Sequence, residues 1–378
     1  MHLVDMPAYY PPHKGGVEAY AHELHRRLLE ANPGLRITVF TSAIGAPAGT
    51  EHLGDRWKVV RWPGFEIISH YPLPNPGFTK RLRAECGPDT VLMTHTRFYW
   101  PHVWASLFAK RAKLRRLHVE HGSSPVQSGN AFVRFVAFMV DALTSQPVLR
   151  WADEVVSVSG SAGKFVKDLA GRDAKVLHRG IELPDDLVAQ PVEEPPTVVF
   201  VGRLINGKGV ADLLNATAEV HRRGLPLRLR LLGDGPNAAE LKALTGTLGL
   251  AESVEFVGAV DHDTALAGMA RGTVFVNPSW TEGLPTTVLE AAAIGCNVVA
   301  TDVGGTAEII TDGVTGRLVP ARDVTALANA LEAAVRDPER AAKATKLREI
   351  TRQNFSWDTA VAEFTGLLAG GGAAGRSR

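Results

Sequence analysis

Short runs rich in β-branched residues alternate with amphipathic helical stretches along almost the whole chain, and this alternation constrains the fold most. The expected strands of the first half are Ile37–Thr41, Val59–Trp62, Val91–Thr94, Leu117–Glu120, Val155–Val158 and Lys175–Leu177. Those of the second half are Val198–Val201, Leu227–Leu232, Val254–Val257, Val274–Val276, Val298–Thr301 and Gly316–Val319. Helical stretches such as Val17–Ala31, Val210–Arg223 and Val324–Val335 separate most of them. Strand–helix alternation predicts an α/β protein with doubly wound parallel sheets covered on both faces.

The segment Pro184–Pro196 has four prolines and four acidic residues, which predicts a linker between two such domains. The charge changes sign there. Residues 1–183 hold 23 basic and 16 acidic residues (+7), and residues 184–378 hold 18 and 24 (−6). A basic first half indicates an anionic partner or surface. We therefore expect domains at 1–183 and 197–354, a linker at 184–196 and a disordered tail at 370–378.

The composition is that of an ordinary globular protein, with 45% hydrophobic and 21% charged residues. The two cysteines, Cys86 and Cys296, lie far apart, so no disulfide framework or metal spacing is indicated. The first residues lack a basic region followed by a long apolar run, so no signal peptide is expected, and no apolar stretch reaches the about 20 residues that a membrane-spanning helix needs. We expect a cytoplasmic protein without a nucleic-acid partner.

Two glutamates stand eight residues apart in TEGLPTTVLE, Glu282 in a loop and Glu290 in a helix that we expect to open at Pro285. A helix start favours an anion such as phosphate, since its N–H groups lack partners and it carries partial positive charge. Carboxylates would repel phosphate but suit neutral hydroxyls. The alternative is a loop acid and an exposed helix acid without further role.

The loop from Gly202 to Gly209 nearly matches the phosphate-binding loop of nucleoside triphosphatases, but Gly209 replaces the Ser or Thr that holds magnesium. Arg203 and Lys208 remain as two cations able to clamp a diphosphate without a metal. A surface turn with two solvated charges is the alternative.

Other loops give weaker signals. Gly15-Gly16 precedes a helix and would let the backbone approach a ligand, and the turn at Gly235 could admit a base or ribose. His121 follows a strand, where it could donate a hydrogen bond to a sugar hydroxyl or assist proton transfer. The pair Asp261 and Asp263 has metal-ligand spacing, but capping of the next helix is the favoured interpretation.

Five basic residues among the seven from Lys110 to Arg116 would attract anionic lipid head groups. Nearby aromatic residues that could sit at the same interface are Phe98, Tyr99, Trp100 and Trp104. A solvated helix end leading into a strand explains the cluster equally well.

Together these segments resemble family 4 of the retaining glycosyltransferases, which have the two-domain GT-B fold. The resemblance is carried by PPHKGGVEAY, HVEHGSS, WADEVVSVS, FVGRLINGKGV, LLGDGP, VEFVGAV, NPSWTEGLPTTVLEAAAIGCNVVATDVGG and AEIITDGVTGRLV. The spacing E-x7-E around a GLP insert is its most specific element. It implies two Rossmann-like domains facing across a cleft, with a C-terminal helix at 355–369 that crosses back to the first domain. At Arg179 the sequence departs from the usual Asn of the family, which leaves that loop without an assigned role.

The resemblance also implies a role for each matching position. Arg203 and Lys208 would hold the diphosphate of a nucleotide-sugar donor, Glu290 its ribose and Glu282 its sugar. Further donor contacts would come from Gly15, Gly16, Gly235, Val257, Gly283, Leu284 and Pro285, and His121 would lie near the reacting centre.

The implied reaction is retaining, metal-independent transfer of a hexose, in cell-surface polysaccharide or glycolipid synthesis, with no cofactor. The acceptor stays open between a glycan, a lipid-linked and a small-molecule hydroxyl, and so does peripheral contact with the anionic inner face of the cell membrane. A nucleotide-sugar epimerase, a magnesium-dependent triphosphatase and a non-catalytic sugar-nucleotide sensor are the alternatives.

Overall fold

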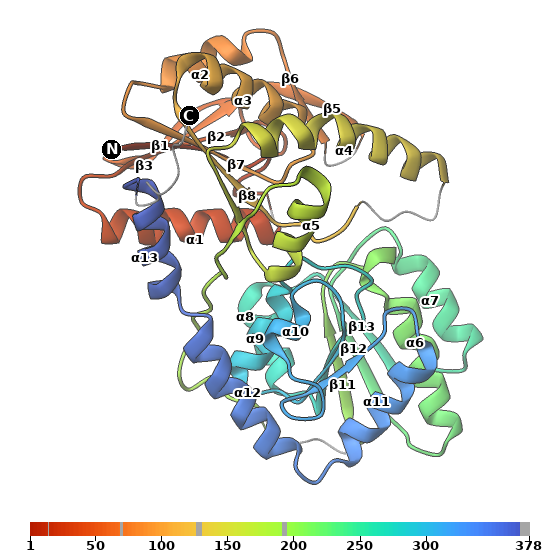
Figure 1. Ribbon diagram of the computed structural model, residues 1–378. Helices are drawn as coiled ribbons and strands as arrows, with labels where there is room; N and C mark the ends of the chain where they lie inside the picture. The colour runs from red at the N-terminus through yellow and green to blue at the C-terminus, as the bar shows by residue number, and fades with distance from the viewer. Residues whose placement is uncertain (14, 69–70, 126–130, 191–194, 371–378) are drawn as a thin grey trace. The chain divides into compact units, whose positions relative to one another are not determined.

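The computed structural model describes residues 1–13, 15–68, 71–125, 131–190 and 195–370 (Figure 1). The chain forms two compact units. Unit 1 comprises Met1–Arg179 together with the segment from Trp357 onward, and unit 2 comprises Gly180–Ser356. Of the tail expected to be disordered, residues 371–378 lie outside the described ranges.

Unit 1 is built on an eight-stranded sheet in the order β10-β9-β8-β7-β1-β2-β4-β3. Its strands are β1 His2–Met6, β2 Arg36–Ser42, β3 Gly49–Gly54, β4 Trp57–Trp62, β7 Thr90–His95, β8 Arg115–Glu120, β9 Glu154–Ser157 and β10 Lys175–Val176. All neighbours pair in parallel except β3 with β4. Every residue of β1 and of β7 is buried, as expected for central strands covered on both faces.

Helices cover both faces of this sheet (Figure 1). They are α1 Gly16–Ala31, α2 Phe78–Glu85, α3 Trp100–Ala112, α4 Ala131–Trp151, α5 Gly160–Ala170 and α13 Trp357–Leu368. Although α13 is last in the chain, it packs on α1, where the Trp357 ring stacks on Tyr20 and Thr365 accepts a hydrogen bond from Asn32. The C-terminal segment therefore completes unit 1.

Unit 2 holds a six-stranded sheet in the order β13-β12-β11-β14-β15-β16, parallel throughout. The strands are β11 Thr197–Val201, β12 Arg228–Leu232, β13 Val254–Gly258, β14 Val274–Asn277, β15 Val298–Thr301 and β16 Arg317–Val319. The helices are α6 Val210–Arg222, α7 Ala238–Thr247, α8 His262–Ala270, α9 Thr286–Ile294, α10 Thr306–Ile309, α11 Val324–Arg336 and α12 Arg340–Asn354, with a short 3₁₀ turn η1 at Asn206–Lys208. Valine, leucine and alanine side chains of the sheet, α6 and α11 form its main core.

Both sheets reverse their strand order once, and the reversal positions the loops of interest. In unit 2 the chain runs outward from β11 to β13, then returns to β14 on the other side of β11. In unit 1 the reversal lies between β1 and β7. Ligands of doubly wound sheets bind at the carboxyl ends of the strands beside such a point.

Four strands, β1, β3, β5 and β6, lie outside the ranges expected from the sequence. Strand β3 is antiparallel and fully exposed, and β5 Gly64–Ile68 pairs antiparallel with β6 Tyr71–Pro74 as a separate ribbon. Residues 184–190 of the expected linker hydrogen-bond to unit 2, since Ala189 N donates to Ile294 O and Gln190 N donates to Ala270 O. Within the described ranges, no helix combines the length and apolar character needed to cross a bilayer.

Candidate functional site

The loops after β11 and β14 meet at the reversal point of unit 2. Gly209 has φ of +65°, and a Cβ there would lie 1.9 Å from the Pro278 carbonyl oxygen. Trp280 N donates to Gly207 O at 2.9 Å, so the two loops also share a backbone hydrogen bond. Only glycine fits at position 209, because both the backbone conformation and the lack of space exclude a side chain. Packing therefore explains why position 209 is a glycine, where the phosphate-binding loop of nucleoside triphosphatases has Ser or Thr.

An ion pair between Lys208 and Glu282 joins the same two loops. Their Nζ and Oε1 atoms lie 2.7 Å apart, with 27% and 12% of the respective side chains exposed. The structure thus brings together two of the residues that the sequence singled out, 74 positions apart. Arg203 lies exposed on the first loop, and among the described residues its guanidinium has no ion-pair partner. Two cations and one carboxylate therefore share this end of the sheet.

Helix α9 begins at Thr286, one residue later than expected, and Pro285 is its N-cap in an extended conformation. A proline side chain has no acceptor atom, so the cap residue itself cannot satisfy the first N–H groups of the helix. Leu284, just before it, is buried. The helix start lies directly after the loop that carries Glu282, which places its partial positive charge near the Lys208–Glu282 pair.

Glu290 is buried on α9 and is not the exposed helix acid of the alternative interpretation, since only 8% of the residue is exposed. His262, at the start of α8, lies beside it, with Nδ1 4.0 Å from the Glu290 Oε1 atom. A carboxylate held at low exposure is suited to accept hydrogen bonds from neutral hydroxyls.

Gly235 and Val257 lie at the carboxyl ends of β12 and β13, the next strands along the same edge. A Cβ on Gly235 would lie 2.5 Å from the Leu204 carbonyl oxygen, and one on Gly304 (φ +57°) would lie 1.9 Å from the Glu282 carbonyl oxygen. Gly305 N donates to Gly283 O at 2.7 Å. These glycines let the loops pack on one another, which fixes the backbone around Glu282 and Gly283.

His121 lies in unit 1, at the carboxyl end of β8. Gly15 is the N-cap of α1 and Gly16 its first residue, so this helix also starts one residue from the expected position. Tyr20 of α1 packs edge-on against the His121 imidazole, with ring centroids 5.2 Å apart. The helix that begins at Gly16 and the loop that begins at His121 are therefore neighbours within unit 1.

The sequence interpretation missed a buried polar network around His121. Asp5 on β1 contacts both His25 and His95, and His95 contacts His121. Asp5, His25 and His95 are fully buried. The sequence offered two signals for this network: Asp5 inside the strand HLVDM, and His95 at the end of VLMTH.

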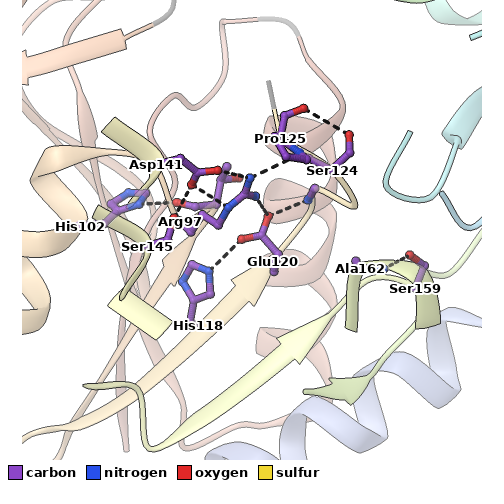
Figure 2. Close-up of polar contacts among 12 residues, drawn as sticks. Arg97, His102, His118, Glu120, Ser124, Pro125, Asp141, Ser145, Ser159 and Ala162 are labelled. Atoms are coloured by element: carbon purple, nitrogen blue, oxygen red, sulfur yellow. Dashed lines mark hydrogen bonds and ion pairs between the residues drawn. The ribbon is translucent and has the colours of Figure 1, made fainter. Parts of the chain in front are cut away.

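A second network holds the backbone that follows His121 (Figure 2). Glu120 Oε1 accepts from Gly122 N at 2.7 Å and from the Arg97 guanidinium at 3.0 Å. Arg97 also forms two 2.9 Å hydrogen bonds with Asp141 of α4. Burial alone would raise the pKa of Glu120, but Arg97 and then His118 lower it to about 2. The charged Arg97 therefore ties the turn after His121 to the helix layer.

The structure bears on two further expectations, the role of Asp261 and the basic cluster from Lys110 to Arg116. Asp261 caps α8, since its side chain accepts from Thr264 N at 2.7 Å, which confirms capping. The basic cluster does not form one patch, because Arg115 pairs with Glu154 and Arg116 with Asp153 on neighbouring strand ends. The cations that remain exposed in this cluster are Lys110, Arg111 and Lys113.

Comparisons with known proteins agree with this arrangement. The model of Glycosyltransferase Family 4 matches residues 14–184, and the model of Glycosyl transferases group 1 matches residues 195–337. The chain is a family 4-like glycosyltransferase of the GT-B fold. The expectation drawn from the E-x7-E segment is thereby confirmed.

Similar proteins cover nearly the full chain. An uncharacterized glycosyltransferase of Methanocaldococcus jannaschii is 27% identical, covering 96% of both chains. A GDP-mannose-dependent alpha-(1-6)-phosphatidylinositol monomannoside mannosyltransferase of Mycolicibacterium smegmatis is 29% identical, again covering 96% of both. Among solved structures, sucrose-phosphate synthase of Thermosynechococcus elongatus has a TM-score of 0.79 at 22% identity, covering 99% of this chain and 100% of that one. At that identity the likeness concerns the fold.

Proposed function

We propose that this glycosyltransferase moves a hexose from a nucleotide-diphosphate sugar to an acceptor hydroxyl, with retention of the anomeric configuration and without a metal ion. The Lys208–Glu282 ion pair at the reversal point of unit 2 carries this proposal, because a cation expected to bind the diphosphate lies 2.7 Å from an acid expected to bind the sugar. The mannosyltransferase relative uses GDP-mannose by its name, which supports a nucleotide-sugar donor.

In the proposed site Lys208 and Arg203 bind the diphosphate, together with the N–H groups at the start of α9. Negative charge builds on the diphosphate as its bond to the anomeric carbon breaks, and fixed cations stabilise that charge without reorganising. A guanidinium and an ammonium supply what a divalent ion would otherwise supply. The site is therefore proposed to act in the presence of a chelator.

The two carboxylates are proposed to bind the uncharged sugar and ribose of the donor. Glu282 accepts hydrogen bonds from sugar hydroxyls and Glu290 from the ribose, while the backbone around Val257 contacts the base and Gly235 leaves room beside it. Glu282 is not assigned as a covalent nucleophile, because retention is proposed to come from the departing phosphate, which acts on the same face of the sugar as the acceptor. An oxygen of the departing phosphate is proposed to take the proton from the acceptor hydroxyl. Both groups then lie on the same face of the donor sugar.

A lipid-linked acceptor at an anionic membrane is the proposed substrate class. Between α2 and α3 lies a hollow of about 520 Å³ whose lining includes Arg83, Arg111 and Trp104. Trp104 is 42% exposed at its edge. Two cations, Arg83 and Arg111, beside the exposed Trp104 suit a lipid surface that carries phosphate groups. Vesicles with anionic lipid at low salt should bind the protein, and Arg83→Ala with Arg111→Ala should abolish that binding; equal binding by the double variant contradicts the proposal.

The test of function is acceptor-dependent release of nucleoside diphosphate. The protein is incubated with UDP-glucose or GDP-mannose, with EDTA, and with or without a phosphatidylinositol glycolipid acceptor. We expect nucleoside diphosphate to be released only when acceptor is present. NMR of the product should show an axial anomeric bond, as in the donor. Donor epimerised without acceptor indicates the epimerase alternative, and binding without turnover for every acceptor class indicates a sensor.

A further inference from the structure

Three polar residues at the carboxyl ends of adjacent strands form a hydrogen-bonded chain in unit 1. Asp5 lies on β1, His95 ends β7, and His121 follows β8. His95 Nε2 lies 2.9 Å from the Asp5 carboxylate, and His95 Nδ1 lies 2.9 Å from His121 Nε2. Solvent does not reach Asp5 or His95, so the protein alone must satisfy their polar atoms.

The charge of Asp5 determines which atom donates in each hydrogen bond of this chain. Burial alone would raise the pKa of its carboxyl, but His95 and His25 lower it below its usual range, so the group is a carboxylate that only accepts. His25 Nε2 and His95 Nε2 must both donate to it. A neutral His95 then has no hydrogen on Nδ1 and accepts from His121 Nε2–H. His121 is left with a lone pair on Nδ1.

The other arm of the network agrees with this assignment. His25 has no hydrogen on Nδ1 for the same reason, and the Tyr10 hydroxyl lies 3.0 Å from that atom, where it can donate. If His25 and His95 are neutral, every hydrogen bond from Tyr10 to His121 is satisfied around one carboxylate. The opposite assignment at His121 requires a second hydrogen on the buried His95 ring, that is, an imidazolium.

We propose that Asp5 and His95 are positioning residues that fix His121 in the tautomer with its hydrogen on Nε2, so that Nδ1 accepts a hydrogen bond from a substrate hydroxyl. The choice of substrate rests on the proposed glycosyl transfer, whereas the tautomer rests on the hydrogen bonds that join a charged Asp5, a neutral His95 and His121. Among the described residues, none hydrogen-bonds to His121 Nδ1. In this proposal His121 is an acceptor, whereas from the sequence we expected a hydrogen-bond donor or a group that assists proton transfer.

Further contacts hold the His121 ring in this role. Burial, then His95, lowers the pKa of His121 well below its usual value of 6.5, so the ring stays neutral at neutral pH and, in the assigned tautomer, keeps the lone pair on Nδ1. Tyr20 packs against one side of the ring. Glu120, anchored by Arg97, holds the next peptide through Gly122 N.

Tautomers can be read directly in the full-length protein labelled with ¹⁵N-histidine. Long-range ¹H–¹⁵N spectra separate a protonated ring nitrogen from a bare one, and His121→Asn identifies the His121 signals. We expect wild-type His121 to carry its hydrogen on Nε2 and not on Nδ1. His102 is an internal reference of the opposite kind, since its Nδ1 lies 3.0 Å from the Thr96 carbonyl and must donate. A hydrogen on His121 Nδ1, or an imidazolium at His95, overturns the proposal.

Asp5→Asn tests the link between Asp5 and His121. The amide oxygen of the substituted side chain can keep the hydrogen bond from Met6 N, which places an N–H group where Asp5 had an acceptor. His95 is then no longer obliged to donate, so we expect part or all of His121 to carry hydrogen on Nδ1 while His102 is unchanged. An unaltered His121 overturns the proposal. If Asp5→Asn does not fold, His95→Phe removes the acceptor of His121 Nε2–H and gives the same expectation.

The role in turnover is tested on the same variants. For Asp5→Asn we expect kcat to fall about 100-fold, as for a misplaced hydrogen-bonding group. The Kd for UDP and GDP should stay within about twofold, because the proposed diphosphate ligands belong to unit 2. A changed tautomer with unchanged kcat overturns the positioning role. Absence of transfer by the wild-type protein instead overturns the proposed function, and leaves the tautomer result standing.

Discussion

Removing the charge of Glu282 should affect two ligands in opposite directions. Lys208 is already paired with Glu282 in the structure, at 2.7 Å. A diphosphate that binds Lys208 therefore has to compete with this carboxylate. Glu282→Gln keeps the shape and the hydrogen-bonding oxygen but removes the competing charge. Nucleoside diphosphate alone should bind more tightly, whereas the proposed contact of a nucleotide sugar with residue 282 changes from a charged to a weaker neutral hydrogen bond.

The size of each effect follows from the exposure of the pair. With 27% and 12% of the side chains exposed, the pair falls at the upper end of measured surface pairs, about 1 kcal/mol. Its loss should tighten binding of UDP or GDP by up to about fivefold. A hydrogen bond from a sugar hydroxyl to a charged group contributes about 1.5–3 kcal/mol. The amide of Gln keeps a neutral hydrogen bond of about 0.5–1.5 kcal/mol, so about 1–1.5 kcal/mol is lost. The ratio of Kd for nucleotide sugar to Kd for nucleoside diphosphate should then rise about 5- to 10-fold.

Isothermal titration with UDP, UDP-glucose, GDP and GDP-mannose in EDTA measures this ratio. The matched control is Glu332→Gln on α11, which removes a partly exposed ion pair to Arg223 elsewhere in unit 2. The control should leave all four Kd values unchanged. If Glu282→Gln weakens nucleoside diphosphate more than tenfold, or leaves the ratio unaltered, Glu282 is neither the competitor of the diphosphate nor the ligand of the sugar.

Three other predictions concern the clamp, the loop packing and the acid side of the stability curve. Arg203→Ala with Lys208→Ala should reduce transfer at least about 100-fold, measured as nucleoside diphosphate release, whereas Lys346→Ala, an exposed cation on α12, should not; undiminished transfer refutes the clamp. Gly209→Ala should lower the free energy of unfolding by about 2–4 kcal/mol in urea, because its Cβ meets the Pro278 carbonyl, while Gly207→Ala, with nothing within 4 Å, should be nearly neutral; equal effects refute the packing argument. The pKa of Glu120 is about 2 in the folded protein against 4.5 unfolded, which contributes about 3 kcal/mol of stability above pH 4.5 that is lost as the pH falls toward 2. In urea titrations, the free energy of unfolding of Glu120→Gln should therefore decline less steeply over that range than that of the wild type. A parallel decline contradicts this prediction.

Much of the fold could be predicted because parallel strands buried on both faces are apolar runs. Val274–Asn277 and Val298–Thr301 are fully buried and were recognisable from their residues alone. Strand β3 was not, since GTEHLG is exposed throughout and shows no apolar periodicity. The β5–β6 ribbon contains prolines, which argue against strands in a sequence.

The candidate site was only partly predictable. The residue types and their place after strands pointed to Lys208 and Glu282, but their direct pairing depends on how two distant loops pack. From the sequence, Gly235 was expected to leave room for a base or ribose, and the structure adds a second reason for a glycine there, the Leu204 carbonyl in the neighbouring backbone. The Asp5–His95–His121 chain needed the strand order, because β1, β7 and β8 are adjacent in space and not in sequence.

The most direct test is a crystal structure of the protein soaked with a nucleotide sugar in EDTA. The account predicts diphosphate oxygens within about 3 Å of Lys208 Nζ and of the Arg203 guanidinium, at the start of α9, with no metal density between them. The sugar hydroxyls should lie on Glu282 and the ribose on Glu290. A donor bound away from these loops, or a diphosphate held through a divalent ion, would contradict the account.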